Sequence, residues 1–331
     1  MAEIANESEA PALGRLYGEK RGFIAGVSGD RLFHLATLVL TLIVLGLLIG
    51  VTAMLVWSAR ESIVRFGLHF LVTSDWDPVN DQFGALPFIY GTVVSSALAL
   101  IIAVPLSLGV ALCLNEMAPR WLSSPLGFMV ELLAAIPSVV YGLWGIFALG
   151  PFLRDQVEPF LARYLGFIPL FQGPRVSVSM LSAGVILAVM VIPYISAVCT
   201  DVFASVPTAQ REAALALGAT RWEMVRMAVL PYGLLGVVGA IILGLGRALG
   251  ETIAVAMVIG NRPAISASLF MPASTLASVI ANEFAEATSD LYVSALLELG
   301  LVLLLLGMLV NAVARALVLR ATQRRFGARG R

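Results

Sequence analysis

The sequence predicts an all-α membrane protein with six transmembrane helices and both termini in the cytoplasm. Three observations lead to this class. Hydrophobic residues make up 59% of the 331 residues and charged residues only 13%, about half the charged share of soluble domains. Six apolar runs each come close to or exceed the roughly 20 residues that span a bilayer. Arg and Lys are concentrated on one side of these runs, as expected for cytoplasmic segments.

The six apolar runs define the predicted helices, because a helix satisfies its own backbone hydrogen bonds in lipid. They lie at residues 34–57, 88–114, 128–151, 177–199, 232–260 and 291–318. Residues 1–33 form a polar N-terminal extension without the early apolar segment of a signal peptide, and residues 319–331 form a basic tail. The external segments 58–87 and 152–176 are aromatic and apolar enough to lie along the outer membrane interface.

The basic residues give the orientation. With the N-terminus inside, the segments assigned to the cytoplasm hold 14 Arg and Lys residues and the external segments hold 6. The remaining one, Arg247, lies inside the fifth run. This distribution predicts that both termini are cytoplasmic.

Composition excludes several other classes of protein. The net charge is zero, so nothing favours a nucleic-acid partner. Cys113 and Cys199 lie in or beside apolar runs and fit neither a metal site nor a disulfide framework. The single lysine, Lys20, lies in "YGEKRG", so the chain has no P-loop of its own. We find no catalytic set of residues and no metal-binding spacing, and therefore expect a protein that is not an enzyme.

The fifth run contains two full charges, Arg247 and Glu251, in "GRALGETIAV". A charge near mid-membrane costs about 2.5–3.5 kcal/mol on insertion scales. In one interpretation the two residues, four apart on one helix face, pair and neutralise each other. In the other, Arg247 faces a polar path and binds an anion, for which its planar guanidinium is suited. Both can hold in turn, with the pair loosening when the anion arrives.

Three further polar residues are candidates for lining such a path. They are Ser138, Tyr141 and Thr252. The alternative for Ser138 and Thr252 is a hydroxyl bonded to its own helix backbone, and for Tyr141 a packed ring bonded to a neighbouring helix. Pro137, within the third run, frees a carbonyl and predicts a kink there.

The segment between the fourth and fifth runs reads as two short helices. Pro207 suits a first helical turn, and Gly218 can adopt the left-handed conformation that ends a helix. Thr220 and Glu223 have the spacing of a capping box, and we expect Pro231 to close the second helix and start the next span. The alanines after Glu212 offer a smooth surface to another protein. A helical hairpin lying on the membrane is the alternative.

This segment resembles the EAA loop of ABC importer permeases. The resemblance rests on "EAALALG" followed after ten residues by "VLP", with Ala228 in place of the usual Ile. It implies that residues 206–231 form a coupling helix that docks in a groove of an ATP-hydrolysing subunit. The residues assigned to this contact are Arg211, Glu212, Ala213, Ala214, Gly218, Leu230 and Pro231.

Other stretches resemble phosphate-specific permeases of the PstC type. They are "FGALPFIYGT" (83–92), "ELLAAIPSVVYGLWG" (131–145) and "GRALGETIAVAMVIGN" (246–261). The resemblance implies a type I ABC importer permease fold, with a permease core at 88–318, in the cell inner membrane. It also implies a pathway for inorganic phosphate that includes Arg247 and Glu251. The implied partners are a homologous second permease, a dimer of ATPase subunits that bind ATP and Mg²⁺, and an extracytoplasmic phosphate-binding protein. No cofactor is expected in this chain.

Two alternative functions remain at this point. A permease for another oxyanion, such as sulfate or molybdate, would share the same architecture. A secondary transporter or channel driven by ion gradients would work without a partner ATPase and would tolerate bulky residues at Gly218.

Overall fold

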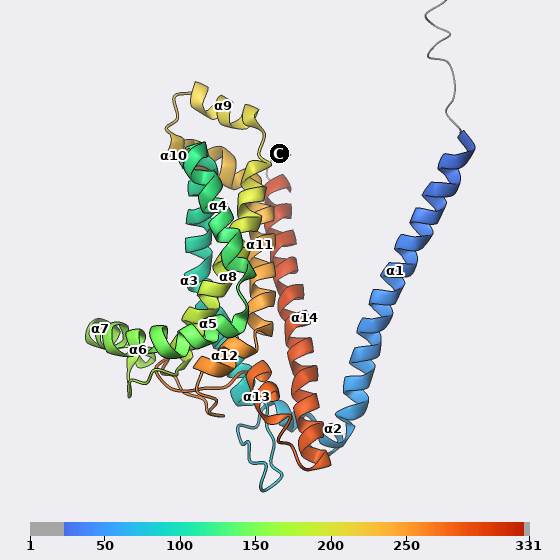
Figure 1. Ribbon diagram of the computed structural model, residues 1–331, viewed down its shortest axis with the longest axis vertical. Helices are drawn as coiled ribbons and strands as arrows, with labels where there is room; N and C mark the ends of the chain where they lie inside the picture. The colour runs from blue at the N-terminus through green and yellow to red at the C-terminus, as the bar shows by residue number, and fades with distance from the viewer. Residues whose placement is uncertain (1–22, 328–331) are drawn as a thin grey trace, which may run out of the picture. The chain divides into compact units, whose positions relative to one another are not determined.

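The computed structural model describes residues 23–327, which are almost wholly helical (Figure 1). Extended pairing in this range is limited to isolated bridges, Asp77 with Gln82 and Gly260 with Ala273. The predicted polar extension 1–33 and basic tail 319–331 lie partly outside the described residues. The α-helices are α1 (Phe23–Ser58), α2 (Arg60–Phe66), α3 (Leu86–Leu112), α4 (Arg120–Ala135), α5 (Ser138–Trp144), α6 (Gly150–Phe152), α7 (Glu158–Leu165), α8 (Met180–Ala204), α9 (Thr208–Ala216), α10 (Arg221–Met224), α11 (Leu230–Gly250), α12 (Ile253–Val258), α13 (Leu276–Glu283) and α14 (Asp290–Gly327).

Short segments of other helix types join these elements. The 3-10 segments are η2 (Gly67–Leu71) and η6 (Pro169–Phe171), and the π-helical segments are η3 (Cys113–Met117), η4 (Gly145–Leu149), η5 (Leu153–Val157) and η7 (Val225–Val229). The chain divides into two units, residues 1–54 and 55–331.

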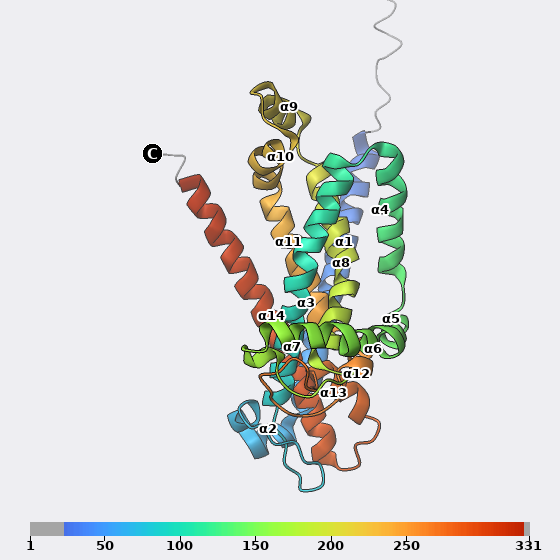
Figure 2. The same ribbon diagram turned by 90° about the vertical axis from the view of Figure 1, so that its left-hand side faces the viewer.

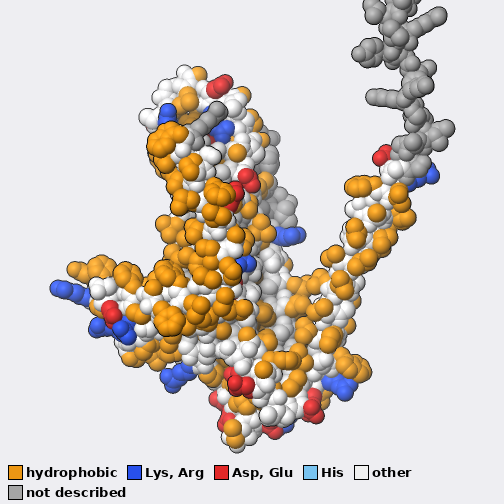
Figure 3. Space-filling view, viewed as in Figure 1, with side chains coloured by type: hydrophobic (Ala, Val, Ile, Leu, Met, Phe, Trp, Pro, Cys, Tyr) orange, Lys and Arg blue, Asp and Glu red, His pale blue; other side chains and the backbone are white. Residues whose placement is uncertain are grey.

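Five helices in the described residues are long and apolar enough to cross a membrane. They are 29–58, 86–117, 180–204, 221–250 and 290–316. A sixth crossing is possible if the bent pair 121–135 and 138–165 counts as one span. In Figure 3 hydrophobic side chains cover most of the visible face, and many charged side chains lie near the ends of the helices and on α7.

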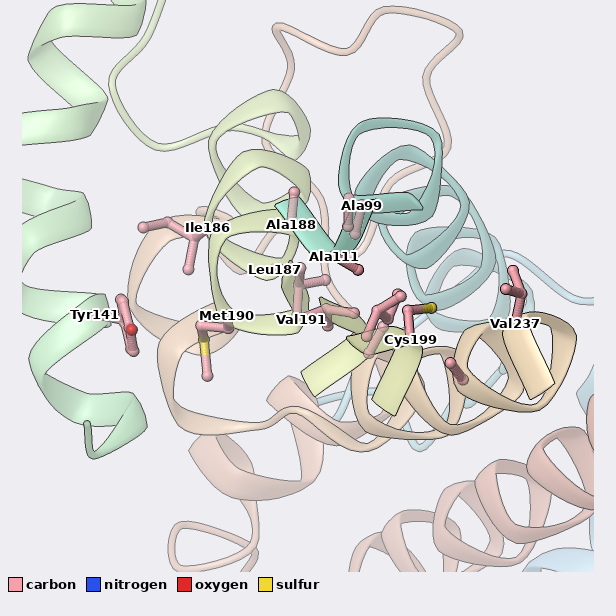
Figure 4. Close-up of a cluster of buried hydrophobic side chains, with 14 of the residues drawn as sticks. Ala99, Ala111, Tyr141, Ile186, Leu187, Ala188, Met190, Val191, Cys199 and Val237 are labelled. Atoms are coloured by element: carbon pink, nitrogen blue, oxygen red, sulfur yellow. The ribbon is translucent and has the colours of Figure 1, made fainter. Parts of the chain in front are cut away.

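The main core of residues 55–331 lies where α8 packs between α3 and α11. Small residues allow this close approach: Ala99 and Ala103 on α3 are fully buried, and Gly184 on α8 lies against Leu98. Figure 4 shows the larger side chains of α8, such as Leu187 and Val191, within this cluster. Small residues at helix contacts are typical of membrane proteins, because packing rather than hydrophobicity holds helices together in lipid.

A second core joins α13 and α14 to the start of α3. Phe83 stacks on Tyr292 with ring centroids 5.3 Å apart. Glu283 at the end of α13 accepts hydrogen bonds from the Trp76 indole at 2.8 Å and from the Tyr292 hydroxyl at 2.6 Å. These bonds hold the loop that carries Trp76 against two helices distant in sequence.

The start of α13 rests directly on α3. Gly91 lies so close to the carbonyl of Ser274 that a Cβ at residue 91 would be 2.0 Å from that oxygen. The neighbouring Thr92 hydroxyl accepts a hydrogen bond from the Leu276 amide at 2.9 Å, one of the amides that a helix start leaves without a backbone partner. Thr92 therefore anchors α13 at a point where Gly91 allows contact between backbones.

The bounds predicted for the third helix, 128–151, are wrong, because the chain forms two helices there instead of one. The chain forms α4, breaks at Ile136 and Pro137, and resumes as α5, with a bend of 92°. Ile136 is extended (ψ 128°), as the residue before a proline prefers, and Pro137 has no amide to continue the ladder. The predicted kink at Pro137 is thus confirmed. Both views show the run from α5 to α7 lying across the direction of α3, α8 and α11 (Figures 1 and 2).

The predicted fifth helix at 232–260 is also wrong at both ends. The helix runs from Arg221 to Gly250 as one 30-residue segment, and Glu251 is extended (ψ 128°) before the separate short helix α12. The expected end of the preceding helix at Pro231 does not occur. The π-helical turn η7 leads directly into α11, and Pro231 lies in the first turn of that helix.

Two helices, α9 and α10, form a hairpin between α8 and α11, as the sequence predicted, and the residues of its turn adopt the predicted conformations. Gly218 adopts φ 84°, a conformation that costs a residue with a Cβ about 1–2 kcal/mol. The Thr220 hydroxyl accepts from the Glu223 amide, and the Glu223 carboxylate accepts from the Thr220 amide, which completes the predicted capping box. Figure 1 places this hairpin at the same end of the helices as the C-terminal end of α14.

Candidate functional site

Two broken helices meet beside Arg247. The break between α4 and α5 and the break between α11 and α12 are followed by short helices that pack on each other. Gly142 on α5 makes this possible, because a Cβ at residue 142 would lie 2.5 Å from the Met257 sulfur and 3.3 Å from Ala254 Cα. Discontinuous helices expose backbone groups and helix ends inside a transporter, and such points often form its binding site.

Arg247 lies in the last turn of α11, where the helix dipole favours a cation. Its guanidinium carbon is 4.4 Å from the centroid of the Tyr194 ring, in a cation–π contact. Its Nε atom is buried and has no hydrogen-bond partner among the described residues, although 36% of the side chain is exposed. A ring face therefore supports the cation without accepting hydrogen bonds from its nitrogens.

Tyr194 connects this cation to the bend in the third apolar segment. It projects from α8, and its hydroxyl donates to the Ala134 carbonyl at 3.1 Å. The Tyr141 hydroxyl donates to the adjacent Leu133 carbonyl at 2.8 Å. The break at Pro137 leaves the last carbonyls of α4 without helical partners, so two tyrosines satisfy the backbone that the bend exposes.

Glu251 balances Arg247 from the other side of the α11–α12 break. Its Oε2 lies 3.9 Å from an Arg247 Nη2, and 9% of its side chain is exposed. Its Oε1 accepts from the Ala254 amide at 3.4 Å, at the start of α12. The two residues form the predicted pair, but on two sides of a helix end rather than on the face of one continuous helix.

The other predicted path residues lie around these breaks. Tyr141 is buried on α5, and Ser138 is half-buried at the first position of α5. Thr252 lies in the link after Glu251, and its hydroxyl donates to the Gly250 carbonyl at 3.3 Å. The structure thus brings Arg247, Glu251 and Thr252 to one helix break and places Ser138 and Tyr141 after the other.

The predicted coupling residues occupy the α9–α10 hairpin and its exit. Glu212, Ala213 and Gly218 are exposed, whereas Ala214 is buried. Leu230 and Pro231 begin α11. The exposed surface of the hairpin also includes Leu215, Leu217 and Trp222, which are 44%, 88% and 62% exposed. Such an apolar surface on polar helices is typical of a protein contact.

Arg211 is the exception in the predicted coupling set. The residue as a whole is half-buried, but its guanidinium points into the chain. There it pairs with Glu116 of η3, the segment that follows α3, at 2.7 Å. The side chains of Arg211 and Glu116 are 18% and 5% exposed.

Sequence reasoning missed Tyr194 and Glu116. A single tyrosine in an apolar run looks like a packed ring, and nothing in its spacing links it to Arg247. Glu116 lies just after an apolar run, where an acidic residue is read as solvated. The described residues hold no group of three or more His, Cys, Asp and Glu that could bind a metal ion.

Comparison with known proteins gives a consistent result. The family model for "Binding-protein-dependent transport system inner membrane component" matches residues 103–323. The chain is 46% identical over 299 residues to the phosphate transport system permease protein PstC of Mesorhizobium japonicum, covering 89% of this chain and 91% of that protein. It is 47% identical over 295 residues to the protein of the same name from Pasteurella multocida, covering 88% and 92%.

A solved structure supports the fold. A chain of a bacterial alginate ABC transporter, solved in complex with an alginate-bound periplasmic protein, matches with a TM-score of 0.60 and 17% identity, covering 89% of this chain and 96% of that chain. At this identity the match concerns the fold alone.

Proposed function

The chain belongs to the family of binding-protein-dependent transport system inner membrane components, and we propose that it is the permease subunit of an ATP-driven importer of inorganic phosphate. The substrate is assigned from the sequence identity of 46–47%, over nearly the whole chain, to proteins named phosphate transport system permeases. The cation beside two helix breaks gives this substrate a physical basis, because guanidinium groups bind phosphate oxygens through paired hydrogen bonds.

In this proposal Arg247 is the main positive charge on the path. The Tyr194 ring supports the guanidinium without occupying its hydrogen-bond donors, so an anion can engage them. Glu251 balances the charge at 3.9 Å when the path is empty. When phosphate binds Arg247, Glu251 keeps its bond to the Ala254 amide, or takes up a proton from the phosphate, which reduces repulsion between the two anions.

We further propose that the α9–α10 hairpin docks on a partner ATPase, which binds ATP and Mg²⁺. The exposed Ala213, Leu215 and Trp222 would form the contact. A second, homologous permease would supply the other half of the pathway, and a phosphate-binding protein would dock on the opposite side. The hairpin and the C-terminal end of α14 lie at one end of the helices, which fits a C-terminus on the same side of the cell inner membrane as the ATPase. On the distribution of Arg and Lys we propose that both termini are cytoplasmic.

The test is transport by the reconstituted complex. The chain, its second permease and the ATPase subunits are placed in liposomes, with phosphate-loaded binding protein on one side and ATP on the other. We expect uptake of labelled phosphate only when ATP and the ATPase are present. Uptake that persists without the ATPase would support the secondary transporter, and uptake of sulfate or molybdate in place of phosphate would refute the substrate.

Replacing Tyr194 separates its two roles. Tyr194→Leu removes the ring beneath Arg247, and a cation–π contact is worth about 0.5–2 kcal/mol. We expect phosphate uptake to fall about twofold to thirtyfold. Tyr194→Phe keeps the ring but loses the bond to Ala134, and we expect it to retain most of the uptake. Initial rates in the reconstituted complex measure both, and equal loss in the two variants would show that the hydroxyl matters instead.

A further inference from the structure

The guanidinium of Arg211, on the surface helix α9, donates hydrogen bonds to a carboxylate and to two backbone carbonyls of the same chain. Its Nη2 donates to Glu116 at 2.7 Å, and its Nε lies 3.2 Å from both carboxylate oxygens. The Asn115 amide also donates to Glu116 at 3.1 Å, which steadies the carboxylate. Arg211 and Glu116 are 95 residues apart in sequence, so the pair joins two separate parts of the fold.

The same guanidinium also bonds to the backbone at the end of α8. Nη2 donates to the Phe203 carbonyl at 2.7 Å, and Nη1 donates to the Val206 carbonyl. The Phe203 carbonyl lies in the last turn of α8 and also accepts from the Val206 amide at 3.2 Å. Val206 lies two residues beyond the end of α8, so Arg211 adds side-chain bonds to the backbone on both sides of that helix end. All three nitrogens of the guanidinium are therefore engaged, in a planar arrangement that a lysine could not reproduce.

These bonds fix α9 to the part of the chain that forms the main core. Glu116 belongs to η3, which continues α3, and Phe203 lies in the last turn of α8. The packed pair of α3 and α8 is the centre of the core. Apart from Arg211, α9 is joined to the core by the short turn after α8 and by packing on α10 and η7, where Ala214 is buried.

We propose that Arg211 and Glu116 form a clamp that transmits displacement of α9 to α3 and α8, so that Arg211 is a positioning residue for transport rather than a contact of the ATPase. This inference rests on the proposed function. A push on the exposed face of α9 would then move the cytoplasmic ends of two core helices together, instead of being absorbed by the turn between α8 and α9.

The test measures coupling, which a simple structural role would not change in an assembled complex. Phosphate uptake and ATP hydrolysis are measured in the same liposomes for wild type, Arg211→Ala, Glu116→Ala and the double variant. We expect ATP hydrolysis to persist and phosphate taken up per ATP to fall about tenfold in each single variant, within the range of typical coupling energies. The double variant should be no worse than Arg211→Ala, because the two residues act through each other.

Arg315→Ala is the matched control, because Arg315 is an exposed arginine in the C-terminal half of α14. We expect this variant to leave the amount of phosphate taken up per ATP unchanged. Arg211→Lys keeps the charge and should assemble, with a ratio between those of wild type and Arg211→Ala. Wild-type uptake in these liposomes tests the proposed function separately. An assembled Glu116→Ala complex with a wild-type ratio overturns the clamp. Loss of assembly in every variant, Arg211→Lys included, also overturns it, since the pair would then serve folding alone.

A reversible linker tests the same idea in one assembled protein. Glu116→Cys and Arg211→Cys are combined in a Cys113→Ser chain, because Cys113 is exposed while Cys199 is buried. A reducible bis-methanethiosulfonate linker then joins the two thiols. We expect linking to restore phosphate uptake per ATP and reduction to lower it again. The same ratio before and after reduction would refute transmission through this pair.

Discussion

Replacing Arg247 by Gln is expected to reduce ATP-dependent phosphate uptake at least about thirtyfold, the rate equivalent of roughly 2 kcal/mol. Glutamine keeps hydrogen-bond donors but removes the charge that attracts the anion. It also leaves Glu251, 9% exposed, as a carboxylate without its cation beside the path, where it repels phosphate. Initial uptake rates, normalised to the amount of assembled complex, measure the effect.

Two companion variants separate charge from geometry at this site. Arg247→Lys keeps the charge but replaces the planar guanidinium with a single ammonium group, and we expect an intermediate rate. Glu251→Gln removes the balancing charge but can still accept the bond from the Ala254 amide. Full uptake by both Arg247→Gln and Glu251→Gln would show that phosphate does not pass this site.

Replacing Gly91 by Ala is expected to have the largest effect on stability, about 3 kcal/mol or more. The new Cβ would lie 2.0 Å from the Ser274 oxygen and 2.9 Å from its carbonyl carbon. Both are backbone atoms, so no side chain can rotate away to make room. The start of α13 must move off α3, and the bond from the Leu276 amide to Thr92 is lost with it. Thermal unfolding of the purified protein in detergent measures the change.

Gly109→Ala in the same helix is the matched control. A Cβ at residue 109 meets nothing within 4 Å, and alanine favours an α-helix over glycine by about 0.5–1 kcal/mol. We expect this variant to unfold at the wild-type temperature or slightly above it. Equal stability of Gly91→Ala and Gly109→Ala would mean that α13 does not rest on α3 as described.

Much of the helical architecture could be predicted, because a bilayer imposes both length and composition on a helix. The apolar runs located the long helices, and local chemistry located the bend at Pro137, the positive φ of Gly218 and the Thr220 capping box. These features depend on residues close together in sequence. The orientation of the chain in the membrane stays a prediction.

The rest depended on contacts that sequence spacing does not contain. The run 232–260 is apolar on both sides of Arg247 and Glu251, so hydropathy did not mark the end of α11 at Gly250. The pairing of Arg247 with Glu251 was predicted from helical spacing, yet it occurs because the chain turns at Glu251. The roles of Tyr194 and Glu116 arise from helices that meet only in the folded chain. Arg211 lies three residues before the buried Ala214, on the same face of α9. The sequence alone does not show that this face is the covered one, so the inward position of Arg211 could not be predicted.

The unbroken helix from Arg221 to Gly250 has a mechanical consequence. It reaches from the hairpin to Arg247, a length of about 40 Å at roughly 1.5 Å per residue, and its glycines at 236 and 244 press against Val202 and Ile195 of α8. The helix is thus a lever whose fulcrum is that glycine contact. Arg247 lies about 10 Å beyond the middle of that contact, so a tilt of about 5° there would swing it by roughly 1 Å, enough to shift the guanidinium on the tyrosine ring. A displacement of the hairpin at one end would thereby reach the cation at the other without any signal passing through the side chains between them.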